Sequence, residues 1–246
     1  MFSRILIVGL VAGFIAGLVL AAVQHVKVTP LITAAEVYED EAAAHEPAHT
    51  HDRATAAHEH EAAWEPRAGF ERVAFTFLAD LIVAVGFGLV LSGSLAVRHA
   101  IAGHVPDGGE GLLWGFAGFA AFSLAPALGL PPQPPGMVAA AIYSRQAWWI
   151  GTAIATCAGL GLMVFCRHWA LRAAGLVLLI LPHFIGAPVR PAGDDAVTAD
   201  IAARFVAASL VTSAVFWSVL GAVAGWLYAA LEKRHAVLSP RPQQIG

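Results

Sequence analysis

Long apolar stretches separated by short polar segments dominate the chain. A helix needs about 20 mostly apolar residues to cross the hydrocarbon core of a bilayer, and six stretches meet or approach this length. The pattern predicts an all-α, polytopic integral membrane protein with about six transmembrane helices in a single membrane domain. The predicted spans are residues 4–26, 72–97, 111–130, 147–166, 169–187 and 205–230.

The composition supports lipid as the solvent. Of 246 residues, 58% are hydrophobic and only 13% are charged, whereas soluble domains have about 25% charged residues. The net charge of -3 argues against a nucleic-acid partner. Cys157 and Cys166 are nine residues apart and fall on opposite faces of a helix, so neither a disulfide nor a shared metal site is expected.

Basic residues set the expected orientation. An even number of spans puts both termini on one side of the membrane, and each side then carries seven Lys or Arg residues. Because the segments on the side of the termini are about half as long, their basic density is higher, which predicts cytoplasmic termini. The first apolar stretch is longer than the core of a signal peptide, about 7–15 residues, so we expect a retained helix.

Glycines recur at four-residue spacing in three of the predicted spans. Small residues allow helix backbones to approach closely in lipid, where apolar burial provides no driving force. The spacing therefore predicts close-packed helix faces. These glycines are Gly9, Gly13 and Gly17, then Gly111 and Gly115, and finally Gly221 and Gly225.

Residues 27–71 form the one long hydrophilic segment, with ten acidic residues and five histidines. Its Ala-, Glu-, Pro- and Thr-rich composition predicts a flexible extracytoplasmic loop. Imidazole and carboxylate are ligands that borderline divalent metals accept. The segment is either a loose metal-collecting tether or an acidic linker with incidental histidines. The histidines are His45, His49, His51, His58 and His60.

The start of this segment is a candidate mouth for an ion. Gln24 and His25 end the first span. On a helix, Glu36, Glu39 and Asp40 share one face, since residues three and four apart are neighbours. Together with His25 they would form an acidic mouth at the membrane surface. The alternative is a solvated helical turn.

Two ionisable residues fall inside predicted spans. Asp80 lies about 13 Å from the charged start of its span, near the bilayer centre. A charge there costs at least about 2.5–3.5 kcal/mol, so Asp80 either faces a polar pathway or is a hydrogen-bonded packing residue. Pro182 leaves the carbonyl of Leu178 without its helical donor. This carbonyl and His183 suit a ligand set, although His183 alone is also typical of an interfacial residue.

The connection between the third and fourth spans is rich in proline. Five prolines between Pro126 and Pro135 predict a stiff turn, which includes Gln133. Arg145 and Gln146 follow, just before a pair of tryptophans typical of the membrane interface. Arg145 would alternatively pair with an outer carboxylate.

An ordered set of motifs resembles the CbtA family of predicted cobalt transporter subunits. The motifs are Glu36–Glu39, Gly111–Gly115, Leu124–Pro132, Arg145–Trp149, Pro182–Pro188 and Phe216-Trp217. The resemblance implies a bacterial inner-membrane protein associated with cobalt uptake and cobalamin supply. It also implies a small single-span companion, CbtB, with a histidine-bearing tail. The family has a glutamate after the two prolines of the turn, where this chain has Gln133, so a ligand there is weaker or different.

The resulting hypothesis is movement of Co²⁺, or a similar ion such as Ni²⁺, into the cell. No zincin motif, nucleophile elbow or nucleotide fingerprint is present, so we expect neither an enzyme nor a bound cofactor. The alternative is a non-transporting scaffold or metal chaperone that captures metal in its histidine-rich loop and delivers it to a partner. The expected metal-binding residues are His25, Glu36, Glu39, His45, His49, His51, His58, His60, Asp80 and His183. The residues expected to form the pathway or a structural turn are Gln24, Pro126, Gln133, Arg145, Gln146 and Pro182.

Overall fold

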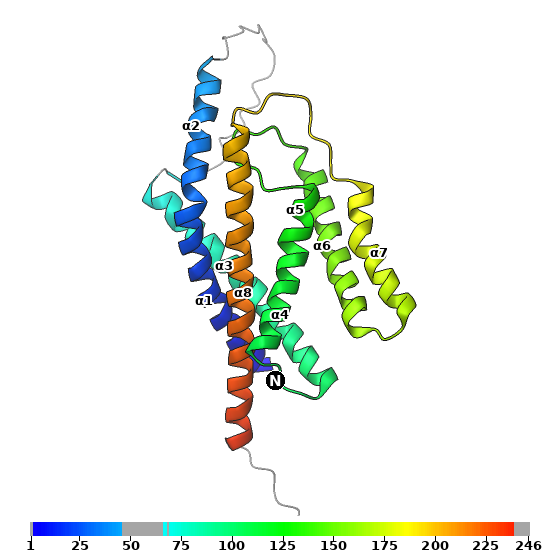
Figure 1. The fold of residues 1–246 in the computed structure, drawn as a ribbon. Coiled ribbons are helices and arrows are strands. Elements are labelled where there is room, and N and C mark those ends of the chain that lie inside the picture. Colours follow the sequence, from blue (N-terminus) through cyan, green and yellow to red (C-terminus); the bar gives the residue numbers. More distant parts are fainter. Residues whose placement is uncertain (1, 46–65, 68, 239–246) are drawn as a thin grey trace, which may run out of the picture.

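The computed structural model describes residues 2–45, 66–67 and 69–238, and these residues contain helices and no strand (Figure 1). The predicted all-α fold is therefore confirmed. The helices are α1 (Phe2–Lys27), α2 (Thr29–His45), α3 (Phe70–Ala102), α4 (Gly108–Phe119), the π-helix η1 (Ala120–Leu124), α5 (Ala125–Gly129), α6 (Ile142–Phe165), α7 (Trp169–Ile185) and α8 (Ala199–Leu238).

Five helical segments are long and apolar enough to cross a membrane. They are α1, α3, the continuous helix formed by α4, η1 and α5, then α6, and α8. The sixth, α7, is apolar but has only 17 residues, which is about 25 Å of helix against a hydrocarbon core of about 30 Å. The chain is thus a multi-pass membrane protein, and its described residues contain five helices long enough to span a membrane and one shorter apolar helix.

The segment 27–71 is not one flexible loop, which corrects the expectation from its composition. Residues Thr29–His45 form α2, which follows α1 almost without interruption because the N–H of Val28 still donates to the carbonyl of Gln24 (2.8 Å). The acidic run is therefore helical. Four of the five histidines of this segment lie outside the described residues: His49, His51, His58 and His60. The side chain of His45, at the end of α2, also lies outside them.

The helices form a bundle with a hairpin beside it (Figure 1). In the bundle, α1 packs on α3 and α8, and α4 packs on α8. The hairpin is α6 and α7, which pack against each other as the two-residue connection predicts. An ion pair between Arg4 and Glu232 joins the start of α1 to α8. The opposite end, called here the α2 end, contains α2, the turn 130–141 and the loop 186–198.

The predicted glycine faces are the closest contacts of the bundle. A Cβ atom on Gly111 would lie 2.3 Å from the carbonyl oxygen of Gly221, and one on Gly13 would lie 2.6 Å from the Cα of Val85. The glycines of α4 therefore meet those of α8, and the glycines of α1 meet the backbone of α3. Such contacts are how helices gain packing energy in lipid.

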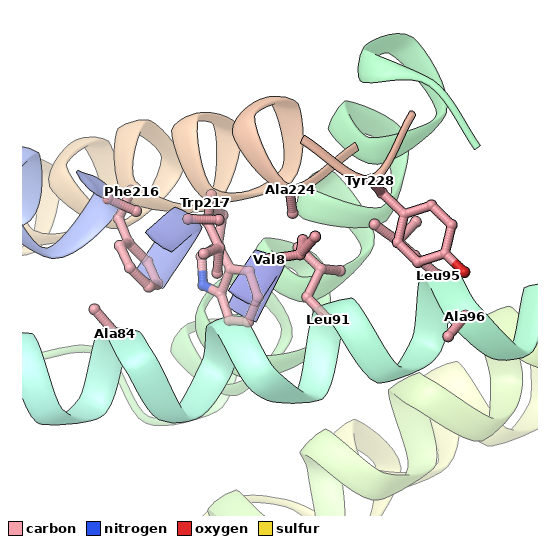
Figure 2. Close-up of a cluster of buried hydrophobic side chains, with 12 residues drawn as sticks. Val8, Ala84, Leu91, Leu95, Ala96, Phe216, Trp217, Ala224 and Tyr228 are labelled. Carbon is pink, nitrogen blue, oxygen red and sulfur yellow. The ribbon is translucent and has the colours of Figure 1, made fainter. Parts of the chain in front are cut away.

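Phe216 and Trp217 of α8 point toward the middle of α3 inside the bundle (Figure 2), and two further aromatic rings pack against them. The ring of Phe87 lies 4.9 Å from that of Trp217 and 5.1 Å from that of Phe122, and Phe122 stacks on Trp217. Phe216 is buried beside them. We call these four residues the aromatic plug. A route for ions along the centre of the bundle would have to pass through it.

Candidate functional site

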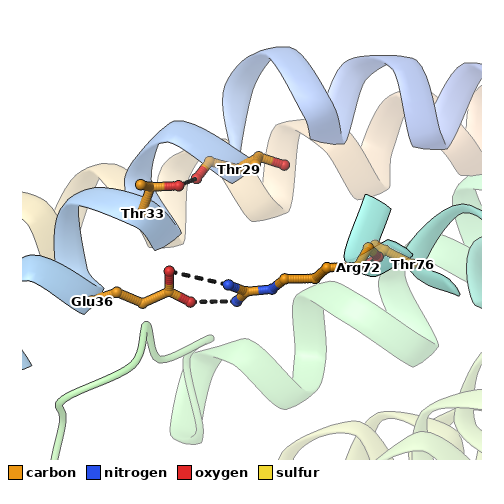
Figure 3. Close-up of polar contacts among 5 residues, drawn as sticks. All are labelled: Thr29, Thr33, Glu36, Arg72 and Thr76. Atoms are coloured by element: carbon orange, nitrogen blue, oxygen red, sulfur yellow. Dashed lines mark hydrogen bonds and ion pairs between the residues drawn. The ribbon is translucent and has the colours of Figure 1, made fainter. Parts of the chain in front are cut away.

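The carboxylate of Glu36 at the α2 end is held by an arginine rather than free (Figure 3). Arg72, in the first turn of α3, pairs with both oxygens of Glu36, with 3.2 Å between Nη1 and Oε2. A guanidinium that binds both oxygens of a carboxylate competes with a metal ion for the same lone pairs. The sequence predicted Glu36 as a metal ligand. In the structure, its carboxylate is paired with Arg72, which the sequence did not predict.

Glu39 lies one turn further along α2, beside the proline-rich turn. A Cβ atom on Gly136 would lie 3.3 Å from the Cβ of Glu39 and 3.0 Å from a methyl group of Val197. Glu39 is exposed, and so is His25 in the last turn of α1. In the part of the chain that the structure describes, no group of three or more His, Cys, Asp or Glu side chains is arranged to hold a metal ion.

Asp195 fastens the loop 186–198 to the proline-rich turn. Its Oδ1 accepts a hydrogen bond from the N–H of Val138 (2.9 Å), and its Oδ2 accepts one from Arg190 (2.8 Å). The N–H of Ala196 also donates to the carbonyl of Gly136 (2.9 Å). The hydrogen bond from Val138, followed by that from Arg190, holds the pKa of Asp195 below its ordinary value. Asp195 and Arg190 were not predicted, because neither stands in a recognisable motif.

This contact predicts a pH dependence. A lowered pKa in the folded protein means that the contact contributes its full stability above the ordinary pKa of aspartate and loses it as pH falls through the lower value. We expect Asp195→Asn to accelerate hydrogen exchange at the N–H of Ala196 at neutral pH, and the difference from the wild type to disappear at strongly acid pH. Asp194→Asn, at the exposed neighbouring residue, is the control and should leave the exchange rate unchanged. Equal rates for wild type and Asp195→Asn at neutral pH would contradict the assignment.

A cavity of about 360 Å³ lies where the turn, the loop and the start of α8 meet. Its walls are mainly apolar, and its polar side chains are Gln133 and Arg190. The Oε1 atom of Gln133 is buried and has no hydrogen-bond partner. The predicted turn residue thus lines a real cavity, which we call the turn cavity.

Trp148 connects this turn to the end of α7. Its ring lies 6.1 Å from the ring of His183, edge to face. A Cβ atom on Gly129 would lie 2.6 Å from the same indole and 3.2 Å from the Cβ of Ala187. Arg145 lies one turn before Trp148 on the same face of α6. The three motifs Leu124–Pro132, Arg145–Trp149 and Pro182–Pro188 therefore converge at the α2 end, where Pro126 and Pro182 are buried and Gln146 is exposed.

Asp80 and His183 do not share one site. Asp80 lies on α3, which packs mainly on α1 and α8, whereas His183 lies on α7, which packs on α6. Asp80 is partly exposed and belongs to the same helix face as the buried Ala84 and Gly88, which contact α1. A single metal site therefore does not contain both Asp80 and His183.

Two features of the spans were missed in the sequence. The helix from Gly108 to Gly129 contains a π-helical turn, η1, where Ser123 bonds Ser213 of α8 (2.8 Å between the hydroxyl oxygens). On α6, the hydroxyls of Thr152 and Thr156 are buried and have no partner. Their spacing of four residues in an apolar span was the available signal, since it puts both on one face. Nothing in the residues around 120 marks a π-helix.

The comparisons with known proteins bear on this site. Residues 2–229 match the model of a protein family described as "Probable cobalt transporter subunit (CbtA)". No curated protein and no solved structure matches the chain. The match extends from α1 into the last third of α8 and includes the three motifs that converge at the α2 end. The family is described as a transporter subunit rather than an enzyme, and a subunit implies a partner chain. The chain belongs to the CbtA family of probable cobalt transporter subunits.

Proposed function

We propose that this chain moves Co²⁺, or a similar divalent ion such as Ni²⁺, into the cell across the bacterial inner membrane, with its termini in the cytoplasm. The family match over residues 2–229 carries the proposal. The geometry at the α2 end supports it, because three matched motifs meet there around a turn cavity, an imidazole and a proline-interrupted helix. A small single-span companion of the CbtB kind is the partner we propose.

The α2 end is the receiving side in this proposal. Exposed His25 and Glu39 attract the ion near the membrane surface, together with the histidines of the segment 46–65. Glu36 acts differently, since its ion pair with Arg72 ties α2 to α3 and orients Glu39 beside the turn. His183 is then the first ligand within the helices, next to the carbonyl that Pro182 leaves free.

The membrane potential is sufficient to drive this movement. It contributes about 2.3 kcal/mol per elementary charge at 100 mV, and so about 4.6 kcal/mol for a divalent cation. At about 1.4 kcal/mol per decade, this energy supports a gradient of over 1,000-fold. No nucleotide-binding motif is needed for such a uniporter.

The test is uptake of radioactive cobalt into proteoliposomes with an imposed potential. We expect His183→Ala to lower the uptake rate by about tenfold or more, equivalent to about 1.4 kcal/mol. Asp80→Asn should lower uptake by a similar factor, because in this proposal the carboxylate within the span faces the polar pathway. His104→Ala, at the exposed opposite end, is the control.

Deletion of residues 43–63 should raise the concentration of cobalt needed for half-maximal uptake without abolishing uptake. Uptake that is indifferent to both His183 and Asp80 would remove these residues from the route.

A metal-delivering scaffold is the second candidate. Two observations favour it: the described residues contain no three-ligand metal group, and the aromatic plug fills the bundle. A purified protein that binds cobalt in equilibrium dialysis but never moves it across the vesicle membrane would support the scaffold over the transporter.

A further inference from the structure

A line of unpaired polar atoms runs along one face of α6. Buried side-chain atoms without a hydrogen-bond partner include Nε of Arg145, Nε1 of Trp148, and the hydroxyls of Thr152 and Thr156. Their positions differ by three or four residues, so they follow one another along a single helix face. Thr152 is 1% exposed and Thr156 is 3% exposed.

Contacts at both ends of the α6–α7 pair place this face against the interrupted part of α7. Gly159 of α6 approaches Gly175 and Leu179, since its Cβ would lie 2.7 Å from the carbonyl oxygen of Gly175. At the other end, Trp148 meets His183. In this antiparallel pair, the two contacts place Thr152 opposite about residues 179–182, where Pro182 interrupts the helix. They place Thr156 opposite about residues 175–178, near the carbonyl of Leu178 that Pro182 leaves without a helical donor.

Unpaired polar groups at this depth require an explanation. A hydroxyl buried without a partner costs about 1–3 kcal/mol, and lipid offers it no hydrogen bond. The line begins at the α2 end, where Gln133 also has a buried, unpaired oxygen and lines the turn cavity. Ordered water is the partner that buried polar groups most often use when the protein provides none.

We propose that the α6–α7 seam is a hydrated half-channel. It opens at the α2 end beside Trp148 and His183, follows Thr152 and Thr156, and ends where Gly159 and Gly175 close it. From Trp148 to Thr156 it extends about 12 Å, less than half of the hydrocarbon core. Its occupant is water, hydrogen-bonded to uncharged hydroxyl, indole and carbonyl groups, and the charged guanidinium of Arg145 lies at its mouth. The half-channel brings water to His183 from one side only, and it bypasses the aromatic plug.

This inference deepens the proposed function, since a half-channel provides the hydration that an ion needs at His183, but its test does not depend on transport. The native cysteines Cys157 and Cys166 are first replaced by alanine. Thr152→Cys and Thr156→Cys, each close in size to the original residue, are then treated in vesicles with a small cationic thiosulfonate, which reacts with a thiol only where water reaches it. The controls are Ala224→Cys in the bundle core, 0% exposed, and Ile154→Cys on the outer face of α6.

We expect both threonine-derived cysteines to react about tenfold faster than either control, or more. Reaction of Thr152→Cys or Thr156→Cys no faster than the controls would overturn the half-channel. The double variant Thr152→Val/Thr156→Val keeps the shape of both side chains and removes both hydroxyls, so uptake of cobalt should fall by about tenfold. If the wild type takes up cobalt and the double variant takes it up at the same rate, the half-channel is not part of the route. If the wild type moves no cobalt, the proposed function fails, and the labelling contrast still decides whether water enters the seam.

Discussion

Gly221→Ala should lower the free energy of unfolding by about 3 kcal/mol, the upper part of the range for overpacking. The added Cβ would lie 2.4 Å from the carbonyl oxygen of Gly111 and 2.9 Å from the backbone of Gly115. These atoms belong to the backbone of α4, so no side-chain rotation relieves the contact and the two helices must separate. The measurement is the midpoint of denaturation of the purified protein in detergent micelles.

Gly93→Ala provides the matched control, because it makes the same chemical change in a helix. A Cβ at Gly93 of α3 meets no atom within 4 Å, and alanine favours the helix by up to about 1 kcal/mol over glycine. Its stability should therefore equal or slightly exceed that of the wild type. If Gly221→Ala were as stable as Gly93→Ala, the close contact of α4 and α8 would be wrong.

Gly129→Ala should lower cobalt uptake by about tenfold while the protein stays folded. Gly129 ends α5, and its Cβ would lie 2.6 Å from the indole of Trp148 and 3.2 Å from the Cβ of Ala187. Here the first atom encountered is a side chain, so the indole shifts and the bundle does not. The shift moves Trp148 relative to His183, and so disturbs the contact at which three motifs converge.

Gly151→Ala on α6 is the control for this prediction, since a Cβ there meets no atom within 4 Å. The measurement combines the uptake rate with tryptophan fluorescence, which reports the changed surroundings of the indole. If Gly129→Ala lowered the free energy of unfolding as much as is expected for Gly221→Ala, Gly129 would serve helix packing alone. Normal uptake with an altered fluorescence spectrum would exclude Trp148 from the route.

Individual helices could be predicted from the sequence because lipid enforces a local rule. In the hydrocarbon core every backbone N–H and C=O must find a partner within its own segment, so about 20 consecutive apolar residues indicate a helix without knowledge of the rest of the chain. Only two residues separate the predicted spans 147–166 and 169–187, and so short a connection favours an antiparallel pair, which α6 and α7 form. The polar segment 27–71 was harder, because composition alone did not distinguish a helix such as α2 from a flexible chain.

The candidate site shows where local rules end. Glu36 has the character of a metal ligand in the sequence, and only the fold brings Arg72, 36 residues away, to its carboxylate. Asp80 and His183 are both ionisable residues in apolar spans, but their helices belong to different packed groups. Thr152 and Thr156 had a visible spacing, yet their burial against the proline-interrupted turn depends on the register between α6 and α7.

The sequence by itself determined that this chain is a helical membrane protein, and which helix faces have glycines for close packing. The tertiary structure decided which faces meet: Gly111 with Gly221, Gly13 with α3, and Gly159 with Gly175. The physical reason is that helix pairing in lipid depends on the fit between surfaces far apart in the chain, because an apolar side chain is equally well solvated by lipid on any face. The convergence at the α2 end follows from that fit, and so do the unpaired polar atoms between α6 and α7.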